Sequence, residues 1–227
     1  MPTGSMDLFD AIYTTRATRK LRHDLPVPDE DVYKILDAGI QAANGGNRQV
    51  WKFIVVRDPR IKRQLGDLYR ELVNWVTSSN PNRKLDSGEL YLGEHMAESP
   101  VIIVVCGISS GNEPPDEATA VGATMPAIEN MLLAARALGY GGNISAVVRR
   151  RQDDLRRILG LGPNAYAATL LPIGVPQGSH GLKSRLPVEE VTYDDTWGNP
   201  TRLKRPASVW KPKLELLSEG DRKKGRG

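Results

Sequence analysis

The sequence has 227 residues, of which 40% are hydrophobic and 26% are charged, and its formal net charge is +4. This composition is typical of a globular chain and excludes collagenous and intrinsically disordered proteins. The single cysteine excludes an intramolecular disulfide, and no apolar run reaches the roughly 18 residues of a membrane-spanning helix. We therefore expect a cytoplasmic protein with a hydrophobic core and no membrane partner.

The positive charge is concentrated at the C-terminal end. Residues 201–227 contain nine Lys or Arg and three acidic residues, so this segment carries +6 while residues 1–200 carry −2. A basic tail can bind nucleic acid, but a nucleic-acid-binding domain usually has a basic stripe on its folded face. We therefore expect no nucleic-acid partner, and we divide the chain into a domain at 1–200 and a basic extension at 201–227.

The first quarter of the chain has two helical patterns. Residues 6–14 predict a short helix with apolar side chains on one side. The apolar spacing over 32–43 predicts a second helix, which begins near Pro28 and ends at the Asn-Gly-Gly stop signal of residues 44–46.

A strand and a further helix follow. Residues 51–57 (WKFIVVR) predict a short strand, because the run is rich in β-branched and aromatic residues. Asp58 and Pro59 open the next helix, which continues through Val76. The polar, turn-rich segment 78–90 predicts a loop or a short helix.

The second half contains the most apolar segments. Residues 101–106 (VIIVVC) are typical of a strand that is buried on both faces. The spacing over 121–138 predicts a long helix, in which Pro126 marks a kink or the effective start. A short charged helix at 152–159 and a strand at 167–175 follow. Because helices and strands alternate without a linker, the sequence predicts one domain of mixed character.

Most motifs of catalytic chemistry are missing from the sequence. It contains no G-x-x-x-x-G-K-[ST] loop, no H-E-x-x-H, no G-x-S-x-G and no Cys/His pair at metal-binding spacing. Residues 160–165 match G-x-G-x-x-A, but they follow a helix and contain a proline, which argues against a dinucleotide site. Because His23, His95 and His180 share no triad spacing with acids, we expect no metal site and no side-chain nucleophile.

Three segments instead carry groups suited to a phosphorylated heterocycle. Arg16 and Arg19 follow the first helix, and Lys183 and Arg185 repeat the cationic pattern near the end of the domain. Residues 44–49 (NGGNRQ) offer glycines for close backbone approach, together with side-chain amides. Each segment alone also fits a simpler interpretation, namely a solvated charged face or a helix C-cap with a turn.

In their order along the chain, these segments resemble the FMN-dependent nitroreductase family. The resemblance covers about residues 7–191 and rests on R-x-x-R, on NGGNRQ leading into WKFIVV, on a helix ending in AARALGYGG, and on KSRLP after the last strand. It implies an α+β fold with a central, mostly antiparallel sheet flanked by helices, in a homodimer of the domain-swapped type with flavins at the interface. Residues 1–200 are then the FMN-binding domain, and residues 201–227 wrap the partner subunit.

The resemblance also implies which residues bind FMN. They are Arg16, Ala17, Arg19, Asn44, Gly45, Asn47, Gln49, Gly142, Asn143, Lys183 and Arg185. The two arginines of the first segment and the two cations of the last segment hold the phosphate from opposite sides. The loop lines the flavin from the partner subunit, and the Gly-Asn pair approaches the isoalloxazine edge through main-chain groups.

The implied activity is an oxidoreductase reaction on the flavin. NADPH or NADH reduces FMN, which then reduces a nitroaromatic, a quinone or a similar electron-poor acceptor in a ping-pong scheme without a catalytic side chain. The basic surroundings of the flavin favour NADPH. Two alternatives remain, namely a flavin-fragmenting or dehalogenating enzyme on the same fold and a non-catalytic module that stores or senses FMN.

Overall fold

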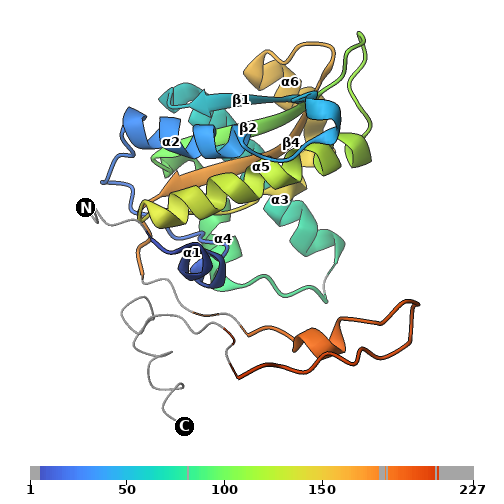
Figure 1. Cartoon of the computed structure of the whole chain (residues 1–227). Helices are drawn as coiled ribbons and strands as arrows, with labels where there is room; N and C mark the ends of the chain where they lie inside the picture. The colour runs from blue at the N-terminus through green and yellow to red at the C-terminus, as the bar shows by residue number, and fades with distance from the viewer. Residues whose placement is uncertain (1–5, 81, 179–181, 183, 208, 210–227) are drawn as a thin grey trace. The chain divides into compact units, whose positions relative to one another are not determined.

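The structure is a computed structural model that describes residues 6–80, 82–178, 182, 184–207 and 209 (Figure 1). Two compact units are present. Residues 15–178 belong to the large unit, and residues 6–14 belong to a small unit together with the described residues from 182 onward. No helix in the described ranges is long and apolar enough to cross a membrane.

The described residues of the large unit form five α-helices and four strands, with three short 3-10 helices between them. In chain order these are α2 (Asp29–Ile40), η1 (Gly45–Asn47), β1 (Trp51–Val56), α3 (Pro59–Ser79), α4 (Ser87–His95), η2 (Met96–Glu98), β2 (Val101–Ile108), α5 (Glu117–Ala137), β3 (Gly141–Gly142), η3 (Ala146–Arg151), α6 (Gln152–Leu159) and β4 (Ala165–Gly174). The small unit contains α1 (Leu8–Thr14) and η4 (Val188–Glu190).

The strands form one sheet in the order β1-β2-β4-β3, and each neighbouring pair is antiparallel. The two-residue strand β3 pairs with the end of β4, where Gly142 lies opposite Ile173. Together with the helices, this sheet confirms the predicted α+β class.

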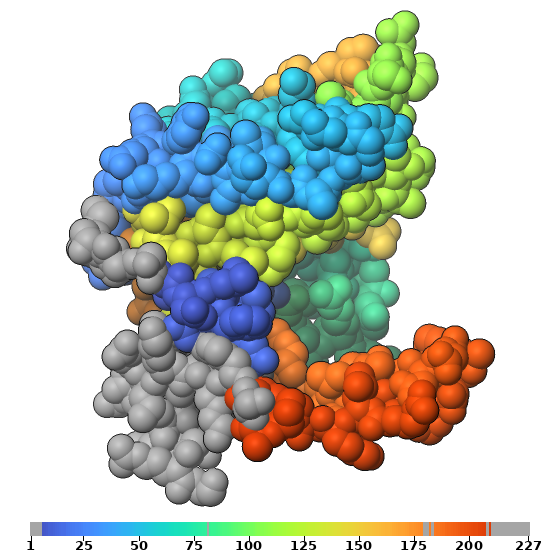
Figure 2. All heavy atoms as spheres, in the orientation of Figure 1, coloured from blue at the N-terminus to red at the C-terminus, as the bar shows by residue number. Residues whose placement is uncertain are grey.

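Helices cover both faces of the sheet, as the two sets of side chains on β2 show. Its residues alternate between two hydrophobic clusters, so that Ile102 and Val104 pack with α3, α4 and α6 while Ile103 and Val105 pack with α2 and α5. Figures 1 and 2 show α2 and α5 side by side on one face. The prediction of a strand buried on both faces is therefore confirmed.

Some boundaries differ from the sequence prediction. Pro126 lies inside α5, which begins at Glu117, so its interpretation as the effective start of the helix was wrong. The start is fixed upstream because the Asp116 carboxylate accepts a hydrogen bond from the Thr119 amide at 2.9 Å. The second helix ends at Ile40, before the Asn-Gly-Gly signal.

The small unit confirms the predicted first helix as α1. Its apolar side chains Leu8 and Phe9 are exposed in the single chain, at 61% and 51%. Further along, Asp194 accepts hydrogen bonds from the Thr201 hydroxyl and the Arg202 amide at 2.8 and 3.0 Å, which closes a loop. Most of the predicted extension at 201–227 lies outside the described residues.

Candidate functional site

Two of the predicted cofactor-binding segments meet at the edge of the sheet. Ala17 forms an isolated parallel bridge with Gly142 of β3, and the Thr18 amide donates a hydrogen bond to the Gly142 carbonyl at 2.8 Å. The arginine segment, residues 16–19, is therefore held directly against the end of the sheet. The fold brings these two segments together although α2 to α5 separate them in the sequence.

This contact requires glycines at both positions of β3. A Cβ on Gly141 would lie 2.6 Å from the Thr18 hydroxyl oxygen, and a Cβ on Gly142 would lie 2.5 Å from Ile173 Cδ1. Both distances are shorter than a non-bonded contact allows. A side chain on Gly141 would push the arginine segment away, and one on Gly142 would displace the buried Ile173 side chain. The glycines thus let the two segments approach closely.

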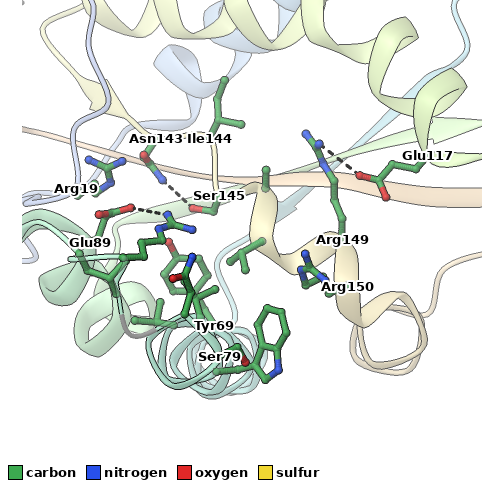
Figure 3. A pocket seen from close by; sticks show the side chains of 18 residues that line it. Arg19, Tyr69, Ser79, Glu89, Glu117, Asn143, Ile144, Ser145, Arg149 and Arg150 are labelled. Carbon is green, nitrogen blue, oxygen red and sulfur yellow. Dashed lines mark hydrogen bonds and ion pairs between the residues drawn. The ribbon is translucent and has the colours of Figure 1, made fainter.

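A cavity of about 780 Å³ lies in the large unit next to this contact. Arg19 and Asn143 both line it, and Figure 3 shows them near Ser145. Asn143 is 3% exposed, and its side-chain amide donates to the Ser145 hydroxyl at 2.9 Å. A volume of this size is within the range of small-molecule and cofactor sites.

The cavity carries an excess of positive charge. Four arginines and two glutamates are among the residues that line it. Three of the arginines are paired, because Arg83 lies 3.2 Å from Glu89, Arg149 lies 3.7 Å from Glu117, and Arg19 lies 3.4 Å from Asp86, which does not itself line the cavity. The potential in such a cavity favours an anionic ligand.

The other end of the cavity is formed by α3 and η3. The Arg150 guanidinium lies over the Trp75 ring at 4.6 Å from its centre, which is a cation–π contact. Figure 3 shows Arg149 and Arg150 at a distance from Arg19 along the cavity. Two cationic regions therefore face one space, and they are supplied by different elements.

Tyr69 of α3 adds a neutral hydrogen-bonding group. Burial raises the pKa of the Tyr69 hydroxyl, and a hydrogen bond with Ser145 partly opposes this shift. The phenol therefore stays protonated at neutral pH and can act as a donor. Sequence reasoning missed Tyr69 and Ser145. For Ser145 a signal was available, because it lies two positions after Asn143.

The predicted loop at 44–49 has a defined but strained conformation. The Asn44 side-chain oxygen accepts a hydrogen bond from the main-chain amide of Gln49 at 2.8 Å. Asn47 and Gln49 have φ angles of 52° and 50°, a left-handed conformation that is costly for residues with side chains. Asn44, Gly45, Asn47 and Gln49 do not line the cavity, and the last three are exposed.

The remaining predicted residues are placed only in part. Arg16 is half-buried, and Ala17 is exposed beside it. Arg185 belongs to the small unit, where it is exposed and donates to the Ser184 carbonyl at 3.1 Å. Lys183 lies outside the described residues. The role of both cations toward a phosphate therefore stays a prediction.

Comparisons with known proteins show the family to which the chain belongs. The model of the Nitroreductase family matches residues 12–175. The chain is 31% identical over 168 residues to a provisionally named NADH dehydrogenase/NAD(P)H nitroreductase of Archaeoglobus fulgidus, with 73% of this chain and 83% of that protein covered. It is also 26% identical over 192 residues to an iodotyrosine deiodinase of Drosophila melanogaster, with 78% and 64% covered.

A solved structure shows the same fold. The NADPH:FMN oxidoreductase of Vibrio harveyi, complexed with NAD⁺, superposes with a TM-score of 0.67 at 20% identity, over 86% of this chain and 79% of that one. The family match spans the arginine segment, the sheet and the cavity described above. The chain therefore belongs to the nitroreductase family of oxidoreductases.

Proposed function

We propose that this protein binds FMN and uses it as an NAD(P)H-dependent oxidoreductase for nitroaromatics, quinones or similar electron-poor acceptors. One observation carries the proposal: the arginine segment is joined to Gly142, and Arg19 and Asn143 line one positively charged cavity. Family membership and the name of the Vibrio harveyi structure support FMN as the ligand.

The residues of the cavity fit the chemistry of FMN. Its phosphate is a dianion, and guanidinium groups such as that of Arg19 bind phosphate oxygens through paired hydrogen bonds. Its isoalloxazine ring is flat and carries carbonyl and ring-nitrogen groups, for which the Asn143 amide and the Tyr69 hydroxyl are suitable partners. Apolar side chains such as Val73 and Val147 also line the cavity and offer an apolar surface to the ring.

When bound, FMN supplies the electron exchange, because it accepts a hydride from a reduced nicotinamide and returns electrons to the acceptor in a second half-reaction. The protein contributes position and electrostatics. Hydrogen-bond donors and cations around the ring stabilise the negative charge that reduction creates, as donors do in an oxyanion hole. The acceptor takes the place of the nicotinamide, and solvent supplies the protons that its reduction consumes, so no side chain needs to act as acid or base.

The proposed hydride donor is NADPH rather than NADH. Arg149 and Arg150 line the cavity at a distance from Arg19. Their guanidinium groups could therefore bind a second phosphorylated ligand while Arg19 holds the FMN phosphate. The extra phosphate of NADPH would gain charge-assisted hydrogen bonds there that NADH cannot make. A ratio of kcat/KM values for the two nicotinamides measures this preference directly, and equal values contradict it.

The proposed site is completed by a second copy of the chain. The loop residues Asn44, Gly45, Asn47 and Gln49 do not line the cavity of their own chain. Two of them, Asn47 and Gln49, have the left-handed backbone conformation that binding loops often contain. In a homodimer they would cover the flavin held by the other subunit. Lys183 and Arg185 would then bind the phosphate of the flavin.

Titration with FMN tests this proposal. Flavin fluorescence should be quenched as the full chain is added, with an end point of about one FMN per chain. Light scattering coupled to gel filtration should show that the flavin elutes with a dimer. A chain that leaves flavin fluorescence unchanged and elutes free of flavin contradicts the proposal.

Dehalogenation is a second candidate, because the resemblance to an iodotyrosine deiodinase covers 78% of this chain. A reductive dehalogenase and a nitroreductase both need reduced flavin, so product analysis is required to separate them. The reduced protein should be offered an iodinated phenol and a nitroaromatic in parallel. Iodide release faster than nitro reduction would assign the dehalogenase activity.

A further inference from the structure

A second cluster of ligand-type side chains lies in the large unit. His23, His95 and Glu98 each offer one ligand atom, and these atoms lie within 4.8 Å of one another. The Glu98 carboxylate oxygen Oε2 is 2.7 Å from His23 Nδ1 and 3.0 Å from His95 Nδ1. None of the three residues lines the cavity of the proposed flavin site.

The fold assembles this cluster from distant parts of the chain. His23 lies in the segment between the arginine segment and α2, whereas His95 is the last residue of α4 and Glu98 is the last residue of η2. The two imidazole rings approach to 5.6 Å between their centres. Sequence spacing did not indicate the cluster, because only His95 and Glu98 are close in sequence.

Surrounding groups orient the histidines. The ring nitrogen Nε2 of His23 lies 3.3 Å from the Tyr91 hydroxyl, so the opposite nitrogen, Nδ1, faces Glu98. Tyr91 is itself held, because the Gln177 side-chain amide donates to its hydroxyl and to the Leu21 carbonyl. Metal-binding histidines commonly have their second nitrogen fixed in this way.

We propose that His23, His95 and Glu98 form a binding site for a divalent transition-metal cation of the zinc class. Ligand atoms at about 2.0–2.2 Å from a tetrahedral ion lie about 3.4 Å apart. The two contacts of Glu98, at 2.7 and 3.0 Å, are shorter than this, so each would have to lengthen by less than about 1 Å to admit the ion. Two imidazole nitrogens and one carboxylate oxygen suit zinc and similar metals, whereas magnesium and calcium prefer oxygen ligands throughout.

The site is open enough for water to complete the coordination. The side chains of His23, His95 and Glu98 are 28%, 37% and 49% exposed. The contacts of Glu98 with both histidines already hold the three side chains together, so metal binding would need little rearrangement. The metal would cross-link the segment that follows Arg19 to α4 and η2. This proposal does not depend on the flavin proposal.

Zinc uptake by the full untagged chain tests the proposal. The protein is treated with EDTA, dialysed against micromolar ZnCl₂ and assayed for zinc by elemental analysis. We expect about one zinc per chain, and retention at least about tenfold weaker in His23→Ala, His95→Ala and Glu98→Gln. Zinc should also raise the Tm of the wild-type chain and not that of these variants.

Two variants serve as controls. Glu94→Gln removes a carboxylate from α4 that pairs with Arg70 at 3.6 Å, and His180→Ala removes the remaining histidine of the sequence. Both should keep the zinc and the Tm shift. A wild-type chain that takes up no zinc overturns the proposal, and so do His23→Ala and Glu98→Gln variants that retain as much zinc as the wild type. Circular dichroism confirms folding, and if one histidine variant does not fold, Glu98→Gln decides the outcome.

Discussion

The two arginines of the arginine segment have different surroundings. The side chain of Arg19 is 25% exposed, lines the cavity and lies 3.4 Å from Asp86, the residue that caps α4. Arg16 is half-buried three positions earlier, beyond the bridge between Ala17 and Gly142. A phosphate held by this segment would thus gain cations that the sheet edge keeps in place.

We predict that Arg16→Gln and Arg19→Gln each weaken FMN binding. Losing one charge-assisted hydrogen bond costs about 1.5–3 kcal/mol, which corresponds to roughly 10- to 150-fold in Kd. Fluorescence titration measures this change. Arg22→Gln is the matched control, because Arg22 lies in the same stretch, pairs with Asp24 at 2.5 Å and faces solvent. An unchanged Kd in both variants would show that Arg16 and Arg19 do not contribute to FMN binding.

Cys106 should be unreactive in the folded protein. It lies in β2 at 1% exposure, and burial raises the pKa of its thiol to about 11. At pH 8 only about one thiol in a thousand is then ionised, and the thiolate is the reactive form. A thiol reagent such as DTNB should titrate nothing in the native chain and one thiol after unfolding. Rapid reaction of the native protein would contradict this placement.

The stability of the folded chain should decrease at acid pH, because a carboxylate caps the start of α3. The Asp58 carboxylate accepts hydrogen bonds from the Ile61 and Arg60 amides at 3.2 and 2.7 Å, and these bonds lower its pKa. Because the folded pKa is below the unfolded value of about 3.9, the stabilisation is complete above that value and is lost as the pH falls through the folded pKa.

We therefore predict that Asp58→Ala lowers the Tm at pH 7 and that its difference from wild type shrinks below about pH 4. Thermal unfolding between pH 7 and pH 3 measures this dependence. Asp58→Asn is the control, since it keeps a capping oxygen without a titrating group and should stay close to wild type at pH 7. A difference that is the same at every pH would contradict the capping role.

The sequence predicted best those elements whose pattern is decided locally. The helix at 152–159 was predicted with the bounds of α6, and the apolar run at 101–106 lies within β2. β3 was not predicted, because Gly141 and Gly142 have no strand preference and their pairing depends on contacts with β4 and Thr18.

The sequence also named two segments that the fold brings together at the candidate site. The approach of Ala17 to Gly142 and the shared cavity of Arg19 and Asn143 agree with the segments named from sequence. The cavity wall was not predicted, because its residues lie on α3 and η3 among ordinary surface charges. Only tertiary packing turns Arg150 and its neighbours toward one space.

The whole molecule should be a dimer that depends on the exposed apolar face of α1. Phe9 is 51% exposed in the single chain, and Trp197 in the same small unit is 92% exposed. Apolar side chains of this size on a surface often mark an interface. Burying one of them contributes about 1.5–3 kcal/mol.

We predict that Phe9→Asp weakens the dimer by at least about tenfold and weakens FMN binding with it. Analytical ultracentrifugation at several concentrations measures the first effect, and flavin titration measures the second. Leu90→Asp is the control, because Leu90 of α4 is equally exposed, at 52%, but belongs to the large unit. A dimer that Phe9→Asp leaves unchanged would exclude α1 from the interface.

The most direct test of the account is the visible absorbance spectrum of the purified protein, followed without oxygen as NADPH is added. We expect a flavin band that bleaches with NADPH and returns when a nitroaromatic is supplied. A flavin band that neither NADPH nor NADH bleaches would instead indicate a storage or sensing module. A protein that shows no flavin band, even after FMN is added, would contradict the proposal that this chain is an FMN-dependent oxidoreductase.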